Sequence, residues 1–117
     1  MVEFALVVPL LMLILFAVVQ FGVVYNHYVT LTDATRAGAR KAAVSRHEAS
    51  PEAAAEASVR NSASGLRQAD LDVDVDASAW EHGEDVTVEA SYPYEIDLLG
   101  LVVAAGQLRS ATTERVE

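Results

Sequence analysis

The hydrophobic pattern divides the chain into one long apolar run and a series of alternating segments. Phe4 to Tyr25 (FALVVPLLMLILFAVVQFGVVY) is long enough to cross a bilayer as a helix, which needs roughly 20 apolar residues. Residues at spacings of three and four then continue along one helix face: Tyr28, Leu31, Thr35, Gly38 and Ala42. The pattern predicts one helix from about Val2 to Arg46, lipid-embedded in its first half and amphipathic in its second.

A cleavable secretory signal and a buried core helix are the alternatives for the apolar run. A secretory signal has an apolar region of roughly 7–15 residues between a basic start and an A-x-A-like site. Here the run is longer, no Lys or Arg precedes it, and no small-x-small site follows Val24. A domain of this size also offers too little interior to bury such a helix on all sides. We therefore expect residues 1–25 to span a membrane.

Two features of the expected helix concern its packing. Ala34, Gly38 and Ala42 form a small-xxx-small stripe, which lets another backbone or a sheet come close. Pro9 lies inside the apolar run and removes one backbone hydrogen bond, which predicts a kink or a loosened turn. Prolines are also commoner in membrane helices than in soluble ones, so Pro9 has a second, purely compositional explanation.

A second, shorter helix is predicted after the first. Ser50, Pro51 and Glu52 are typical of a helix start, with serine as N-cap, proline at the first helical position and glutamate in the first turn. An alanine-rich stretch follows to about Ser64, and Gly65 is predicted as the C-cap.

The rest of the chain predicts a small antiparallel sheet. Residues 71–77 and 86–92 alternate apolar and polar positions on either side of turn residues 81–84, which predicts a hairpin whose second strand ends at Pro93. Residues 96–105 (IDLLGLVVAA) form a second apolar patch, too short to span a bilayer, which predicts a short helix packed on the domain or lying at the membrane surface. Residues 108–116 predict a last strand.

These elements predict an α+β fold in which a long N-terminal helix lies across one face of the sheet. Residues 1–25 form the transmembrane part, 26–47 the amphipathic continuation, and 48–117 a small α+β domain. The formal net charge of −9 argues against a nucleic-acid partner, which requires a basic surface. The chain has no cysteine, so neither disulfides nor thiol chemistry are expected.

The acidic strand raises the question of a metal site. Asp70, Asp72, Asp74, Asp76, Ser78 and Glu81 fall at the ligand positions of a twelve-residue calcium loop. The glycine that such a loop needs at its sharp turn is replaced by Val75, a β-branched residue that resists the turn. A strand with aspartates on its wet face explains the same spacing, and we favour it; an aspartate row on an edge strand also blocks unwanted pairing. Weak binding of divalent ions remains the alternative.

No catalytic, cofactor or metal site is predicted elsewhere. His27, His47 and His82 are far apart and lack ligand-like spacing. No serine lies in a G-x-S-x-G elbow, and no glycine-rich phosphate loop is present in the sequence. The sequence therefore predicts no enzyme and no cofactor.

The basic residues after the apolar run leave orientation open. Arg36, Arg40 and Lys41 follow it closely, and the positive-inside rule would place them in the cytoplasm. Whole domains cross membranes largely regardless of charge, and the rest of the C-terminal part is acidic. These three residues contact either acidic lipid headgroups or solvent.

Glu3 is a carboxylate at the head of the apolar run, where a charge is costly unless it is paired or reaches the interface. One interpretation is a pair with a cation of another chain, for which a free α-amine of a neighbouring subunit is a natural candidate. Such a pair would set the axial register of packed helices. The other is that Glu3 extends to the headgroup level.

The N-terminal blocks resemble the TadE-like family, the pseudopilins of tight-adherence (Flp-type) pilus systems. Val2-Glu3-Phe4-Ala5-Leu6-Val7-Val8-Pro9-Leu10-Leu11 is similar to the family's start, and Phe21-Gly22 fits the same pattern. The run Leu31-Thr32 with Ala34-Thr35-Arg36-Ala37-Gly38-Ala39-Arg40 resembles its second signature. Beyond these blocks the similarity is architectural, and includes the final Arg115-Val116-Glu117.

The resemblance implies a pilin-like fold and a structural role as minor pilin, priming or capping a tight-adherence type IV pilus. It implies assembly contacts at Glu3, Phe4 and Pro9, other pilin subunits and the assembly machinery as partners, and a C-terminal domain outside the bacterial cytoplasmic membrane. It also implies a leader cut after a glycine by a prepilin peptidase; no such glycine precedes Val2, so this partner depends on a leader. A membrane-anchored binding module or accessory subunit is the alternative function.

Overall fold

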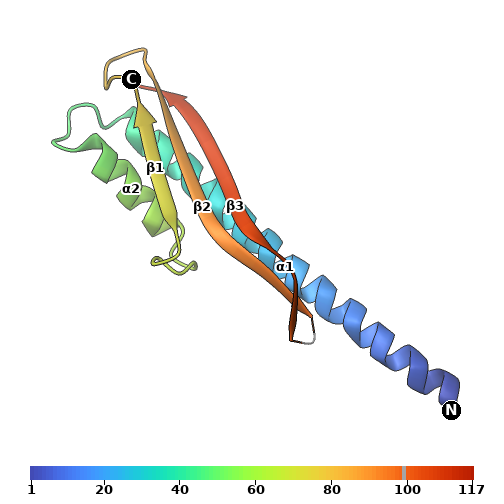
Figure 1. Ribbon diagram of the computed structural model, residues 1–117. Helices are drawn as coiled ribbons and strands as arrows, with labels where there is room; N and C mark the ends of the chain where they lie inside the picture. Colours follow the sequence, from blue (N-terminus) through green and yellow to red (C-terminus); the bar gives the residue numbers. More distant parts are fainter. Residues whose placement is uncertain (99) are drawn as a thin grey trace.

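The structure is a computed structural model that describes residues 1–98 and 100–117. Its elements follow the order α1 (Val2–Ala43), α2 (Pro51–Ser62), β1 (Asp72–Ala77), β2 (Asp85–Leu98) and β3 (Leu101–Arg115). The molecule measures 71 × 23 × 19 Å because α1 projects far beyond the sheet (Figure 1). The predicted α+β fold, a long N-terminal helix on a small antiparallel sheet, is confirmed.

α1 is a single helix of 42 residues. Pro9 lacks the amide hydrogen that would bond the Ala5 carbonyl, yet the helix continues through it without a break. α1 ends at Ala43, slightly before the predicted end at Arg46. Its buried positions all lie in its second half: Leu31, Ala34, Thr35, Gly38, Ala39, Ala42 and Ala43. The first half therefore projects, and only the second half belongs to the core.

α2 begins as predicted, with Ser50 at the N-cap position and Pro51 in the first turn, although the Ser50 side chain makes no capping hydrogen bond. The predicted C-cap at Gly65 is wrong, because the helix ends at Ser62 and Ala63 caps it. Both Ala63 and Leu66 are buried, so the chain leaves the helix early and turns Leu66 into the core.

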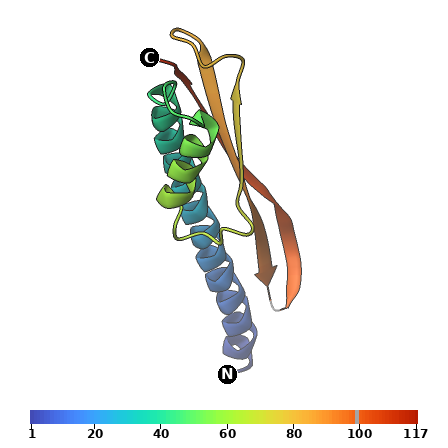
Figure 2. The same cartoon turned by 90° about the vertical axis from the view of Figure 1, so that its left-hand side faces the viewer.

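The sheet is an antiparallel meander with strand order β1-β2-β3. In β1 the aspartates are exposed while Val73, Val75 and Ala77 are half-buried, so the predicted strand with a wet acidic face is confirmed. β2 alternates in the same way, with Val86, Val88, Ala90 and Tyr92 buried. Figure 2 shows α2 and the second half of α1 on the same side of the sheet, where these side chains form the core.

The prediction that Pro93 ends its strand is wrong. β2 continues to Leu98, and Pro93 stands opposite Gln107 of β3. β1 pairs with β2 only as far as Ser91, so beyond that residue one side of β2 is open. A proline, which has no amide hydrogen, is tolerated at such an open side because no ladder hydrogen bond is lost there.

The short helix predicted for residues 96–105 is also wrong. These residues form the end of a β2–β3 hairpin, closed by the pair Leu98 and Leu101, while Leu99 lies outside the described residues. Gly100 has a φ of 80°, a left-handed conformation that glycine adopts without strain. The pairing register shifts between Ile96 and Asp97, so that Val103 has no partner in the ladder and a β-bulge results.

Candidate functional site

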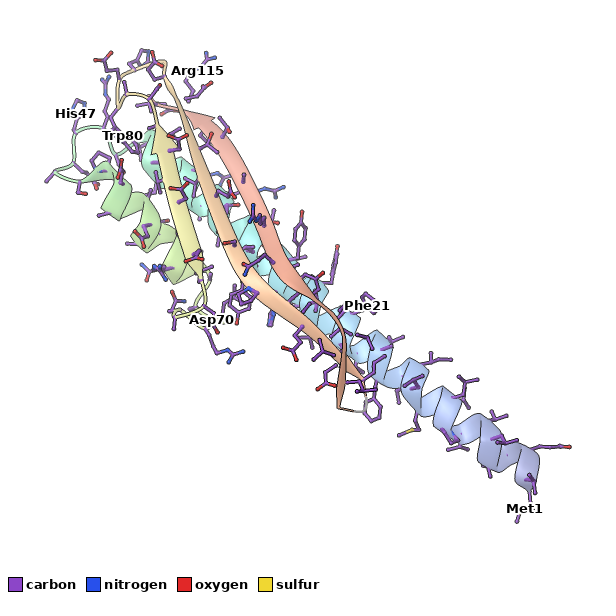
Figure 3. All side chains as sticks on the ribbon, viewed as in Figure 1. Met1, Phe21, His47, Asp70, Trp80 and Arg115 are labelled. Carbon is purple, nitrogen blue, oxygen red and sulfur yellow. The ribbon has the colours of Figure 1, made fainter. Side chains whose placement is uncertain are left out.

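The predicted assembly residues Glu3, Phe4 and Pro9 lie at the free end of α1, which is far from the sheet (Figure 3). All three are exposed, and Phe4 is 72% accessible. An 18-residue window of α1 has a mean hydropathy of 2.8, and none of it is buried. By length and composition, α1 can cross a membrane. This apolar surface indicates membrane anchoring.

The small-residue stripe lies at the other end of α1, between α2 and the sheet. Ala34 and Ala42 are fully buried and Gly38 is buried between them. A Cβ atom on Gly38 would overlap the Val59 side chain and would come 3.3 Å from the Ala55 carbonyl oxygen and from Cγ1 of Val88. Gly38 therefore permits a close approach of α1 to α2. The two groups of predicted residues are not brought together.

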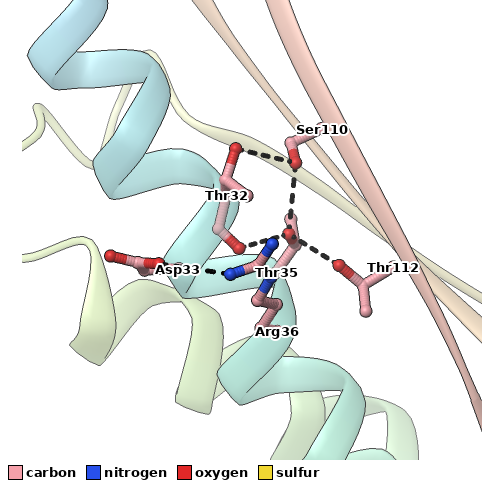
Figure 4. A network of polar contacts seen from close by, with 6 residues as sticks. All are labelled: Thr32, Asp33, Thr35, Arg36, Ser110 and Thr112. Atoms are coloured by element: carbon pink, nitrogen blue, oxygen red, sulfur yellow. Dashed lines mark hydrogen bonds and ion pairs between the residues drawn. The ribbon is translucent and has the colours of Figure 1, made fainter.

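A hydroxyl network joins α1 to β3 (Figure 4). The Thr35 side chain is fully buried, and its hydroxyl donates to the Thr32 carbonyl oxygen at 2.8 Å. The Thr35 oxygen also lies 3.3 Å from the Ser110 hydroxyl and 3.1 Å from the Thr112 hydroxyl. Ser110 in turn donates to the Thr32 hydroxyl at 3.2 Å. Because the partners come from two elements, this network sets the axial position of α1 on the sheet.

A second polar contact lies within the apolar run. The side-chain amide of Gln20 donates to the Asp97 carbonyl oxygen, and its oxygen accepts from the Asp97 amide at 2.6 Å. Asp97 is the residue at the β-bulge, where ladder pairing is interrupted. Gln20 thus supplies one hydrogen-bond donor and one acceptor to the backbone of the hairpin next to the bulge.

A cleft of about 410 Å³ lies between α1 and β2, and Gln20 forms part of its lining. The His27 and Tyr92 rings meet edge to face in it, with centroids 5.4 Å apart and planes at 77°. The Tyr92 hydroxyl accepts a hydrogen bond from the Arg67 amide at 3.3 Å. That hydroxyl, and then the Asp70 carboxylate, raise the pKa of the Arg67 guanidinium, which stays protonated at any physiological pH. His27, Tyr92, Arg67 and Asp70 thus form a chain of contacts with one another at this cleft.

The charged residues form exposed ion pairs, most of them between residues close in sequence, and one, Arg115 with Asp85 at 3.9 Å, between β3 and β2. Within residues 1–98 and 100–117, no three His, Asp or Glu side chains lie close enough to hold a metal ion together. Arg36 pairs with Asp33 on the same helix at 4.0 Å, and Lys41 pairs with Glu48 at 3.1 Å. Such exposed pairs contribute little stability.

Gln20, Asp97 and the Thr35 network were not predicted as functional or structural contacts. Gln20 is a polar residue inside an apolar run, which was a usable signal, because a buried or lipid-facing amide needs a partner. The helical spacing predicts Thr35 on the packing face of the helix, but its partners Ser110 and Thr112 belong to a strand 75 or more residues away. A pattern of periodicity does not identify such a pairing.

Comparison with known proteins supports the resemblance seen in the N-terminal blocks. The family model described as TadE-like protein matches residues 1–40. The match covers the apolar half of α1 and most of its packed half. No curated protein and no solved structure matches the chain significantly.

Proposed function

We propose that this chain, which is TadE-like over residues 1–40, is a pseudopilin or minor pilin that primes or caps a tight-adherence type IV pilus. The observation that carries the proposal is the agreement between that match and one element, α1, whose free half is apolar and whose second half holds the domain. The family is structural, so the role is assembly and not catalysis.

In this proposal each part of the chain has a separate task. The apolar half of α1 holds the subunit in the bacterial cytoplasmic membrane and packs beside helices of other pilin subunits. The domain formed by α2 and the sheet lies outside the membrane and contacts the assembly machinery. Where a leader is removed by prepilin peptidase, Glu3 pairs with the free α-amine of a neighbouring subunit. Burial of this pair between apolar helices strengthens it and penalises any other axial register.

Replacement of Glu3 tests the assembly role. We expect Glu3→Ala to reduce pilus formation and co-purification with other pilin subunits severalfold, while the protein stays in the membrane fraction. Glu52→Ala is the matched control, because Glu52 is an exposed first-turn glutamate of α2, outside the apolar run. Glu3→Asp should retain part of the pilus formation and co-purification because it keeps the negative charge. Unchanged pilus formation by the Glu3→Ala protein would refute the role of Glu3.

An accessory subunit that never polymerises would give a different result. Its Glu3→Ala variant would lose a partner in co-purification, yet the wild-type chain would be absent from sheared filaments. A membrane-anchored binding module would instead bind calcium through the β1 aspartates. Calorimetry of the full chain in micelles, with Asp74→Asn as variant, separates this alternative: micromolar binding lost in the variant favours it, and no heat favours the pilin.

A further inference from the structure

The end of the β2–β3 hairpin lies beside the apolar half of α1, at some distance from the core. Figure 1 shows the two strands running back along α1 toward its free end, and Figure 2 shows the same from the side. Phe16, Gln20, Asp97 and Gly100 line one shallow pocket, so the hairpin reaches at least to the level of Phe16. The side of α1 that faces the hairpin is half-buried from Leu13 onward.

The hairpin tip, defined as Leu98 with Leu101–Val103, presents apolar side chains to the outside. Leu101, Val102 and Val103 are 71%, 57% and 58% exposed. On α1 at the same level, Phe16 is 46% exposed and lines the shallow pocket together with Gly100, the neighbour of Leu101 in the chain. An apolar surface shared by a helix and a hairpin at one level is suited to a lipid boundary.

The polar groups at this level limit how deep the tip can go. If the whole run from Phe4 to Tyr25 lay in hydrocarbon, Gln20 would be about 7 Å below its surface. The exposed Asp97 carboxylate would then be in lipid, together with the unpaired outer edge of β3. Neither an isolated carboxylate nor an open sheet edge is tolerated in hydrocarbon. The boundary must therefore lie closer to Gln20 than to Tyr25.

The length of α1 agrees with this placement. Val2–Val19 is about 27 Å long as a helix, close to the roughly 30 Å of a bilayer core. Glu3 then reaches the headgroups at the opposite surface. Gln20 and the Asp97 backbone satisfy each other where the helix emerges. Only the apolar side chains of the tip extend deeper, by about one helical turn, so that the strand edges and the Asp97 carboxylate stay at the headgroup level, as the polar parts of amphipathic segments at an interface do.

We propose that the hairpin tip inserts into the lipid surface beside α1 and that the hydrocarbon boundary lies at Gln20. The lipid bilayer, and not a second copy of the chain, is the partner of this surface. The inference rests on the membrane anchoring in the proposed function. It places the boundary five residues before the end of the span expected from the sequence. The tip and α1 thereby form two points of attachment, which hold the domain at a set tilt.

Single-cysteine variants of the full chain test this proposal directly, because the chain has no cysteine of its own. An environment-sensitive fluorophore is attached at Val102→Cys in the tip, Leu11→Cys on α1 and Ala111→Cys on β3, an exposed position away from the tip. The proteins are reconstituted in phosphatidylcholine vesicles that carry spin labels on the acyl chains. We expect quenching at Val102 and Leu11 severalfold above that at Ala111. Leu101→Cys serves as a second tip variant if Val102→Cys misfolds by circular dichroism.

The outcomes separate the tip from the anchor. Quenching at Leu11 with an Ala111-like signal at Val102 leaves the anchor intact and overturns the proposal. A Val102 label that is shielded from water but not quenched by lipid, and that becomes exposed on dilution into more lipid, identifies a second copy as the occupant and also overturns it. The absence of quenching at Leu11 would show that α1 does not lie in the bilayer, and would overturn the membrane anchoring on which the proposal rests.

The boundary has its own measurement. A water-soluble maleimide, present on both sides of the vesicle membrane, should modify Val23→Cys rapidly and Val18→Cys slowly, although both side chains are exposed on α1. Equal protection of the two cysteines would place the boundary beyond Val23 and contradict its position at Gln20.

Discussion

Thr35 lies at the centre of the hydroxyl network that joins α1 to β3. Its side chain is fully buried, and its hydroxyl is in contact with Ser110, Thr112 and the Thr32 carbonyl oxygen. A buried hydroxyl is costly without partners, and here every buried side-chain polar atom in the described residues has one. The network therefore favours one axial position of the helix over others, at which these hydroxyls would lose their partners.

Removal of the Thr35 hydroxyl should destabilise the fold. Thr35→Val keeps the shape but leaves Ser110 and Thr112 without their shared partner, so we expect the free energy of unfolding to fall by about 1–3 kcal/mol. Thr113→Val is the control, because Thr113 bonds Thr87 at the exposed face and its loss should cost no more than about 0.5 kcal/mol. Urea unfolding in micelles, followed by Trp80 fluorescence, compares the two. Equal decreases in the free energy of unfolding of the two variants would contradict the stabilising role of the Thr35 network.

At the scale of elements, the approach of α1 to α2 depends on Gly38. The buried positions of α2 are Ala55 and Val59, and Gly38 faces both. Backbone atoms of one helix thus meet side chains of the other with nothing between them. A β-branched valine at position 59 has few alternative rotamers, so it cannot move away easily from an added methyl group.

Two glycine-to-alanine changes in α1 should have opposite effects. Gly38→Ala should lower the free energy of unfolding by about 1–3 kcal/mol, because the added methyl overlaps Val59 in a packed core. A Cβ atom on Gly22 would meet nothing within 4 Å, and glycine is a poor helix former, so Gly22→Ala should be neutral or stabilising by up to about 1 kcal/mol. Thermal unfolding by circular dichroism measures both. Stabilisation by Gly38→Ala would contradict the packing argument.

The elements with strong periodicity could be predicted from the sequence, and those that depend on distant partners could not. α1, α2 and β1 follow from apolar spacing, helix-start residues and alternation around aspartates. The length of β2 could not be predicted, because Pro93 is tolerated only where β1 has ended. The turn at Gly100 carries no Asn-Gly or Asp-Gly signal, so residues 96–105 resemble a continuous apolar segment. The pairing of Gln20 with Asp97 depends on that unpredicted hairpin.

At the scale of the whole molecule, the hairpin joins the domain to the apolar half of α1. Gln20 and Asp97 are 77 residues apart in sequence, and their contact lies well outside the core. Without this contact, the end of the β2–β3 hairpin would extend beyond the core with no hydrogen bond to α1, and such ends open readily. The side-chain amide of one residue therefore limits the motion of the whole hairpin end.

Loss of the Gln20 amide should free the hairpin end without unfolding the domain. Gln20→Ala removes both hydrogen bonds between α1 and the Asp97 backbone, so we expect hydrogen exchange in residues 94–106 to become about fivefold to tenfold faster. Exchange in β1 should not change. Gln107→Ala, which removes the same type of side chain from an exposed position of β3, is the control. Unchanged exchange at the hairpin end of the Gln20→Ala protein would show that the strands alone hold it.

The half-buried residues along α1 also determine from which direction another helix can come. Leu13, Ala17, Gln20, Val24 and His27 face the hairpin, so in this stretch neighbours have access only to the opposite arc of the helix. Because α1 is one unbroken helix, the azimuth of Glu3 is tied to that of the sheet. If copies of the chain pack through the accessible side of α1, each sheet lies on the outside of the helix bundle. Successive sheets are then related by the same rotation as successive helices. The hairpin thus restricts the directions from which other helices can pack on α1, a restriction that a bare helix would lack.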